Sequence, residues 1–338
     1  MLANNEKSYP SVPLLEAGEH PVEKNTYRLP TCAMENMLNA VYSWIEKLTP
    51  GAIVYGRPRA GKTESIFEIA DRLPLLIGKK VPIEIFDCAG YRDNPSTEGQ
   101  FYEDILVQLG YSLSNSGRTI DKANRVIGYM QHQVREANDY RYILFLDEAQ
   151  DLHEKHFKAL MGIHNRLKKL GIHLIIFLVG SPEILSVREA YAQSAQLQII
   201  GRFMVVAHEF NGITSNSDMK VFLEGFDKEQ YPENSGCSYT EYFLPIAYSY
   251  GWRLNKQASL MMSCLKDKLS NETSLKFKSV DIPMQVMPPF VGYILRTLSQ
   301  YDAKDIELDA ALVNDAVDYS DYIEWMRNVE ELPTQTKH

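Results

Sequence analysis

One stretch of the chain combines glycines, a lysine and a threonine at a spacing that can hold phosphate groups. Residues 56–63 follow the pattern G-x-x-x-x-G-K-[ST], which is typical of a phosphate-binding (Walker A) loop. The glycines let the backbone curl so that successive N–H groups point at phosphate oxygens. The lysine is expected to reach the β- and γ-phosphates of ATP, and the threonine hydroxyl to hold Mg²⁺. The residues predicted to bind the nucleotide here are Gly56, Arg57, Pro58, Arg59, Ala60, Gly61, Lys62, Thr63 and Glu64.

An acidic pair follows 85 residues after Lys62. Asp147 and Glu148 close the apolar run of residues 142–146. We expect Asp147 to hold the Mg²⁺ through water, and Glu148 to act as the general base that polarises the attacking water. An exposed acidic pair can end any strand, but the upstream phosphate-binding loop favours the catalytic interpretation.

A small hydroxyl residue ends the next apolar run, residues 173–180. If this run forms the strand beside the one that ends at Asp147, the Ser181 hydroxyl lies near the γ-phosphate and can orient the water. The same hydroxyl could instead cap a helix that starts at Pro182. Both alternatives remain open in the sequence.

Strand-like and helix-like segments alternate between residues 50 and 210. A β-prone run at residues 52–55 precedes the loop, and a helical pattern follows from Thr63. Further strands are expected at residues 81–88, 141–148, 173–180 and 203–206, and helices at 31–47, 99–109, 121–137 and 154–170. This alternation predicts a doubly wound α/β domain with a parallel sheet.

Helical patterns dominate the rest of the chain. Helices are expected at residues 217–228, 239–249, 252–268, 289–300 and 307–318. We therefore predict four parts: an N-terminal arm (1–28), a nucleotide-binding α/β domain (29–211), a helical lid (212–300), and an acidic C-terminal helix and tail (301–338).

Composition limits the partners and the compartment. The net charge is −9, but residues 302–338 hold ten acidic and three basic side chains, so the remainder is nearly neutral and can present a basic track. The four cysteines, Cys32, Cys88, Cys237 and Cys264, form no C-x-x-C motif and are expected to be reduced thiols. The longest aliphatic run is too short for a membrane span, which predicts a cytoplasmic protein without a membrane partner.

Four segments resemble one family of ATPases. Residues 146–150, 177–183, 198–203 and 218–226 look like the AAA+ regulators of DNA transposition, the TnsC/TniB family. The resemblance covers roughly residues 30–270. It implies a P-loop AAA+ sheet core with a C-terminal helical lid, in a bacterial ATPase that forms a ring or helical filament on double-stranded DNA. It also implies two partners, a transposase and a target-selection protein or RNA-guided complex.

The resemblance assigns two further cations to the nucleotide site. Arg202 falls at the position of an arginine finger, which enters the ATP site of the adjacent subunit. A surface arginine is the alternative interpretation, and Arg188 is the second candidate for the finger. Arg253 is our choice for a cation of the lid that senses the nucleotide, with Lys256 behind it and Arg296 as a rival.

The DNA contact is expected on loops between the core strands. The candidates are Arg92, Arg118, Lys122 and Arg125, although charged loop residues are commonly just solvated. A second basic group, on the helix expected at 154–170, is interpreted as an exposed face or a subunit contact. The histidines of that helix, His153, His156 and His164, lack the carboxylate partner of a zinc site.

Two alternatives to a transposition regulator remain open. The first is an AAA+ ATPase of the initiator or secretion-associated type, which uses the same nucleotide chemistry. The second is a scaffold that binds ATP and hardly hydrolyses it. Assays of ATP hydrolysis and of assembly on DNA would distinguish the transposition regulator from these two alternatives.

Overall fold

The computed structural model of the chain describes residues 12–93, 96–112, 114–272 and 281–331. These residues form two compact units. Residues 34–210 make up one unit, and residues up to Ala33 join those from Asn211 onward in the other. Each unit has a hydrophobic core of its own.

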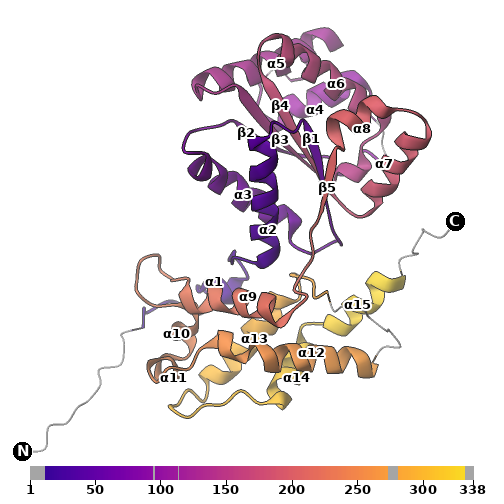
Figure 1. The fold of residues 1–338 in the computed structure, drawn as a ribbon. Helices are drawn as coiled ribbons and strands as arrows, with labels where there is room; N and C mark the ends of the chain where they lie inside the picture. The colour runs from indigo at the N-terminus through magenta and orange to yellow at the C-terminus, as the bar shows by residue number, and fades with distance from the viewer. Residues whose placement is uncertain (1–11, 94–95, 113, 273–280, 332–338) are drawn as a thin grey trace, which may run out of the picture. The chain divides into compact units, whose positions relative to one another are not determined.

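A parallel sheet of five strands forms the centre of the unit of residues 34–210 (Figure 1). Its strand order is β2-β3-β4-β1-β5. The strands are β1 (Gly51–Tyr55), β2 (Ile83–Asp87), β3 (Arg141–Asp147), β4 (His173–Gly180) and β5 (Val206–Glu209). Since parallel neighbours need crossover connections, helices lie between them in the chain. The predicted P-loop α/β fold is confirmed.

Helices cover both faces of this sheet. They are α2 (Cys32–Glu46), α3 (Lys62–Ile77), α4 (Glu98–Gln108), α5 (Thr119–Glu136), α6 (Glu154–Lys169), α7 (Glu183–Gln193) and α8 (Leu197–Phe203), with the 3-10 turn η1 (Ala149–Asp151) after β3. Leu144 and Leu146 of β3 share one core with α4, α5 and α6. Phe145 points to the other face, where it meets Phe177, and Phe177 meets Trp44 of α2. Every residue of β3 is buried, as its continuous apolar run predicts.

The strand register brings three chain segments to the carboxyl edge of the sheet. Asp87 pairs with Asp147 across β2 and β3, and Leu146 pairs with Leu178 across β3 and β4. Tyr55 of β1 pairs with Gly180 of β4. The phosphate-binding loop, the acidic pair and Ser181 follow these strand ends directly, so the sheet places them side by side.

The strand predicted at residues 203–206 is wrong in its position. Phe203 is the last residue of α8, and β5 starts three residues later at Val206. The side chains of Ile199 and Phe203 are buried on one side of α8. A short apolar run that ends a buried helix cannot be distinguished from a strand by its pattern.

The second unit is helical. Its helices are α1 (Pro21–Lys24), α9 (Asn216–Lys228), α10 (Tyr239–Phe243), α11 (Pro245–Ser249), α12 (Ala258–Glu272), α13 (Met287–Ser299), α14 (Ala310–Tyr319) and α15 (Tyr322–Glu331), with the 3-10 turn η2 (Leu254–Gln257) (Figure 1). The helices predicted at 239–249 and 252–268 are each divided in two. Pro245 starts α11, because proline fits the first turn of a helix but not its interior.

The predicted arm and tail are not separate parts among the described residues. Val22 and Leu29 lie in the same core as Leu308, Val317 and Tyr322. Residues 12–33 and 301–328 therefore belong to one helical unit with the predicted lid. None of the described helices combines the length and apolar character that crossing a bilayer requires.

Candidate nucleotide-binding site

The loop between β1 and α3 has the backbone of an anion-binding loop. Gly61 has a φ of 101° and Arg59 a φ of 64°, both in the left-handed region. A Cβ atom on Gly56 would lie 2.0 Å from the carbonyl oxygen of Phe210, so only glycine fits there. The loop leads into the first turn of α3, whose N–H groups have no partner within the helix. Phosphate oxygens fit these donors.

Lys62 lies inside this loop. Its side-chain Nζ donates to the carbonyl oxygens of Gly56 and Arg57, each over 2.9 Å. Burial lowers the pKa of Lys62, and the nearby carboxylates of Glu148 and Asp147 act in the opposite direction. The ammonium therefore lies among the loop's own carbonyls, where a triphosphate would add negative charge.

Thr63 and Asp147 meet as a Mg²⁺ site requires. Thr63 Oγ1 donates to Asp147 Oδ2 over 2.7 Å. Burial raises the pKa of the Asp147 carboxyl, and the hydrogen bonds from Thr63 and from the Glu148 N–H lower it. Mg²⁺ is commonly held by one or two protein oxygens together with phosphate oxygens and water, so this pair fits the ion.

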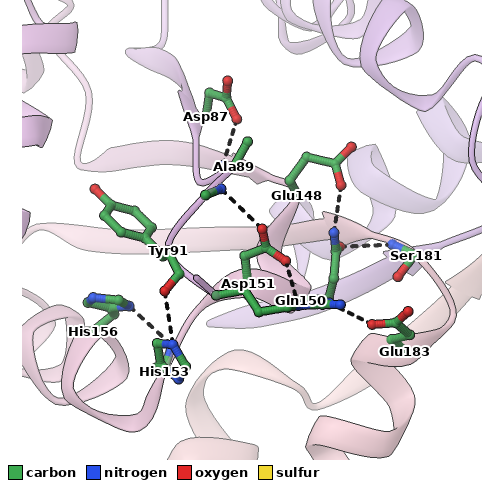
Figure 2. A network of polar contacts seen from close by, with 12 residues as sticks. Asp87, Ala89, Tyr91, Glu148, Gln150, Asp151, His153, His156, Ser181 and Glu183 are labelled. Atoms are coloured by element: carbon green, nitrogen blue, oxygen red, sulfur yellow. Dashed lines mark hydrogen bonds and ion pairs between the residues drawn. The ribbon is translucent and has the colours of Figure 1, made fainter. Parts of the chain in front are cut away.

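The carboxylate of Glu148 is held by a side chain that sequence reasoning missed. Gln150 Nε2 donates to Glu148 Oε2 over 2.6 Å, and Gln150 Oε1 accepts from the Ser181 N–H over 3.0 Å (Figure 2). Glu148 itself has a left-handed φ of 51°. The sequence holds no local signal for this contact, and the structure shows that Gly180 leaves room for it, since a Cβ there would lie 2.2 Å from Gln150 Oε1.

Ser181 follows the strand next to β3, which was the condition for its predicted role. Its Oγ is buried and finds no hydrogen-bond partner among the described residues. The alternative that this hydroxyl caps a helix is wrong, because Pro182 is the N-cap of α7 and no side chain caps it. A buried hydroxyl without a partner can bind a water, as the predicted role requires.

The remaining loop residues differ in exposure. Ala60 is buried and Arg57 is half-buried, whereas Pro58 and Arg59 in the loop and Thr63 and Glu64 at the start of α3 are exposed.

Arg202 lies at the opposite edge of the sheet from the loop. A Cβ on Gly51, the first residue of β1, would lie 2.3 Å from the Arg202 carbonyl oxygen, whereas the phosphate-binding loop follows the last residue of β1. Arg202 is thus at the amino edge of the strands. The pKa of His164 is lowered mainly by burial and also by the nearby positive charge of Arg202.

Arg253 belongs to the helical unit and makes its contacts there. Its guanidinium lies 3.5 Å from the centre of the Tyr248 ring, and it donates to the carbonyl oxygens of Tyr248 and Trp252 over 2.8 and 2.6 Å. Its neighbour Lys256 donates to the Gly251 carbonyl over 3.0 Å. The nucleotide-sensing role of Arg253 stays a prediction.

The four predicted DNA contacts differ in their surroundings. Lys122 is buried and forms an ion pair with Glu103, so its charge is neutralised inside the unit, and its predicted DNA contact stays a prediction. Arg92 bridges Asp151 and Glu183, over 3.2 and 2.6 Å. The side chain of Arg118 is 84% exposed and pairs with Asp121 over 3.3 Å, and Arg125 is half-buried on α5.

The second basic group lies on α6, where part of it is paired. Lys158 pairs with Glu154 on α6, and Lys168 and Lys169 are exposed at its end. Within the described ranges, no three His, Cys, Asp or Glu side chains gather as a metal site. The four cysteines are free thiols.

Residues 49–187 match the model of a protein family described as an AAA domain. This segment is an AAA-type ATPase domain. The match spans the loop, the acidic pair and Ser181. The finer assignment to the transposition regulators stays a prediction.

The chain is similar to several solved structures at low sequence identity. The ORC2 protein of Aeropyrum pernix, in ADPNP–ADP complexes, has a TM-score of 0.50 at 13% identity, over 89% of this chain and 71% of that chain. The ORC1 protein of Aeropyrum pernix in complex with DNA has a TM-score of 0.49 at 12% identity, over 90% and 70%. Cdc6p of Pyrobaculum aerophilum has a TM-score of 0.42 at 14% identity, over 96% of this chain and 88% of that chain. The likeness to the ORC2 protein concerns the fold alone. No curated protein matches the chain significantly.

Proposed function

We propose that this protein is a Mg²⁺-dependent AAA+ ATPase of the initiator type that assembles on double-stranded DNA. The observation that carries the proposal is the 2.7 Å contact between Thr63 and Asp147 beside the buried Lys62. These three side chains come from two strand ends and are the ones that a nucleotide and its metal ion need. The match of residues 49–187 to the AAA domain supports the proposal independently.

Each side chain has a defined part in the hydrolysis. The loop N–H groups and Lys62 bind the β- and γ-phosphates. Thr63 and Asp147 would hold Mg²⁺, and the ion would supply positive charge beside the phosphate oxygens. Glu148 takes a proton from the water that Ser181 orients. The water oxygen bonds to the γ-phosphorus as the bond to the ADP oxygen breaks. ADP and phosphate are released, and Glu148 returns its proton to the phosphate or to the solvent.

Arg202 completes the site of a neighbouring protomer. Its place at the amino edge of the strands supports this, because that edge can meet the carboxyl edge of the next subunit in a ring or filament. A guanidinium offers several donors in a fixed plane, and such fingers contribute roughly 10³–10⁵ in rate. ATP binding therefore favours assembly, and hydrolysis favours disassembly.

The likeness in fold to the ORC2 protein favours the initiator type over the other AAA+ alternatives. DNA is the proposed partner because Arg118 is exposed at the start of α5, and Arg125 follows seven residues later on the same side of the helix. Phosphate contacts of this kind add up over the protomers of an assembly.

A transposition regulator is the second candidate. The resemblance of residues 177–183 and 198–203 favours it, and its partners would be a transposase and a target-selection protein. In that case a transposase encoded beside this gene binds the protein on DNA only with ATP. If gel filtration with purified transposase, DNA and ATP yields no joint complex, this candidate is removed.

Phosphate release by the purified protein tests the ATPase. Wild type should release phosphate with ATP and Mg²⁺, and Glu148→Gln should lose about 10²- to 10⁴-fold while it still binds nucleotide. Lys62→Ala should lose nucleotide binding itself. A wild type no faster than Glu148→Gln would leave only the ATP-binding scaffold.

Electron micrographs test the assembly. With a non-hydrolysable ATP analogue and plain duplex DNA, wild type should form rings or filaments, whereas Lys62→Ala should not. Bare DNA in the wild-type sample would contradict the DNA-bound assembly and leave the ATPase proposal standing.

A further inference from the structure

The amide of Gln150 connects the proposed general base to the end of β4 (Figure 2). It donates to Glu148 Oε2 over 2.6 Å and accepts from the Ser181 N–H over 3.0 Å. We propose that Gln150 is a positioning residue, which holds the Glu148 carboxylate where it takes the proton of the attacking water. This inference rests on the proposed ATP hydrolysis.

The chemistry of the two partners determines the orientation of the amide. A carboxylate only accepts hydrogen bonds, and a backbone N–H only donates them. Gln150 must therefore turn Nε2 toward Glu148 and Oε1 toward Ser181, and the flipped amide would satisfy neither. A glutamine fits this position, because a carboxylate there would repel Glu148 and a short side chain would reach neither partner.

The backbone around Gln150 restrains the amide. Gly180 leaves the space that Gln150 Oε1 occupies, since a Cβ there would lie 2.2 Å from that oxygen. The turn η1 that carries Gln150 is attached on its other side through Asp151, which accepts from the Gly90 N–H over 3.1 Å and pairs with Arg92. The turn is thus tied to the segments after β2 and β4.

Because Gln150 donates to Glu148 Oε2, only one of the two carboxylate oxygens of Glu148 is hydrogen-bonded within the part of the chain that the structure describes. Its Oε1 accepts no hydrogen bond from the described residues, so this oxygen can receive the water proton. Without Gln150 the side chain can rotate away, and a misplaced catalytic group costs about 10²-fold in rate. The loop of residues 56–63 makes no hydrogen bond to Gln150, so nucleotide binding should not change.

The first test compares two glutamines. Gln150→Ala should lower kcat about 10- to 100-fold and leave KM and the affinity for a fluorescent ATP analogue within about twofold. Gln108 is the matched control, because its amide also makes two hydrogen bonds at a strand end, both to the Asp87 backbone, over 2.9 and 3.1 Å. Gln108→Ala should leave kcat within about twofold of wild type.

Two further variants separate positioning from folding. Gly180→Ala should displace the Gln150 amide and lower kcat as Gln150→Ala does, while the double variant should be no slower than Gln150→Ala, because the clash is gone. In single-turnover assays, Gln150→Ala should have almost no effect in the Glu148→Gln background, since residues that act as a unit are not additive.

The outcomes for this inference and for the proposed function differ. A wild type that does not hydrolyse ATP contradicts the proposed function. If wild type hydrolyses ATP, two results would overturn the positioning role. One is a kcat of Gln150→Ala equal to that of wild type, and the other is a loss of rate on Gln150→Ala that is as large in the Glu148→Gln background as in wild type. If Gln150→Ala does not fold, Gly180→Ala becomes the test of the positioning role. An unchanged kcat in Gly180→Ala would then overturn the inference.

Discussion

Thr63 Oγ1 and Asp147 Oδ2 lie 2.7 Å apart although 84 residues separate them in the chain. Thr63 opens α3 after the phosphate-binding loop, and Asp147 closes β3, which lies two strands away from β1 in the sheet. The contact exists because parallel strands end at one edge. It places two oxygens where a single Mg²⁺ can reach both.

The hydroxyl of Thr63 should therefore control the Mg²⁺ requirement. We expect Thr63→Ala to raise the Mg²⁺ concentration for half-maximal phosphate release by about 10-fold or more, because a ligand oxygen is lost. Thr63→Ser keeps the hydroxyl and should stay within about threefold of wild type. Titration of Mg²⁺ at saturating ATP measures both, and equal requirements for the two variants would contradict the site.

Arg202 should act on the neighbour and not on its own protomer. Arg202→Ala should lose roughly 10³-fold or more in kcat and still bind ATP. Mixed with Glu148→Gln, it should recover activity, because some sites then combine an intact Glu148 with an intact Arg202 from the next subunit. The phosphate-release rate of the mixture is compared with the sum of the two variants alone. A mixture no faster than that sum argues against a finger in trans, and Arg188→Ala is the matched comparison.

Arg118 should contribute to DNA affinity in a salt-dependent way. Each lost phosphate contact should reduce the slope of log K against log salt by about one, for every sequence alike. Lys228→Ala is the control, because Lys228 is similarly exposed, with 70% of its side chain accessible, and pairs with Glu224 as Arg118 pairs with Asp121, but lies in the helical unit. Fluorescence anisotropy with duplex DNA measures the slopes, and identical slopes for Arg118→Ala and Lys228→Ala would remove Arg118 from the interface.

His20 should make the helical unit sensitive to acid. Its ring is fully buried, stacks on Tyr242 with a centroid distance of 4.4 Å, and meets Tyr231, Tyr239 and Phe243 edge-on. Burial lowers its pKa from 6.5 to about 4. The unfolded chain therefore binds the proton at a higher pH than the fold does, and stability is lost as the pH falls from 6.5 toward 4.

A phenylalanine at this position tests that dependence. In His20→Phe, Tm should fall less steeply than in wild type between pH 7 and 4.5, even if Tm is lower throughout because the hydrogen bond from the Val22 N–H is lost. A residual slope is expected from His156 in the other unit, whose pKa burial also lowers to about 4. His132→Phe changes an exposed histidine and should keep the wild-type slope. Equal slopes in all three proteins would refute the role of His20.

The nucleotide site could be predicted because its signals are local. The glycines of the loop, Lys62 and Thr63 lie within eight residues, and Asp147 follows a run of apolar residues that can only be a buried strand or a buried helix segment. The same ambiguity explains the failure at residues 203–206, where the apolar run belongs to the end of α8. The break between α10 and α11 was not predicted for a similar reason. The helical pattern of residues continues on both sides of Leu244, where the helix is interrupted.

The amino-acid sequence by itself determined the phosphate-binding loop, the acidic pair and the alternation of strands and helices, because each depends on residues that are close in the chain. The tertiary structure alone decided that Gln150 joins Glu148 to Ser181, and that Lys122 is neutralised by Glu103. These contacts depend on which strands are neighbours and on the packing of α4 against α5. The order of the strands and the packing of the helices depend on how the whole core is buried, so they cannot be predicted from a local pattern of residues.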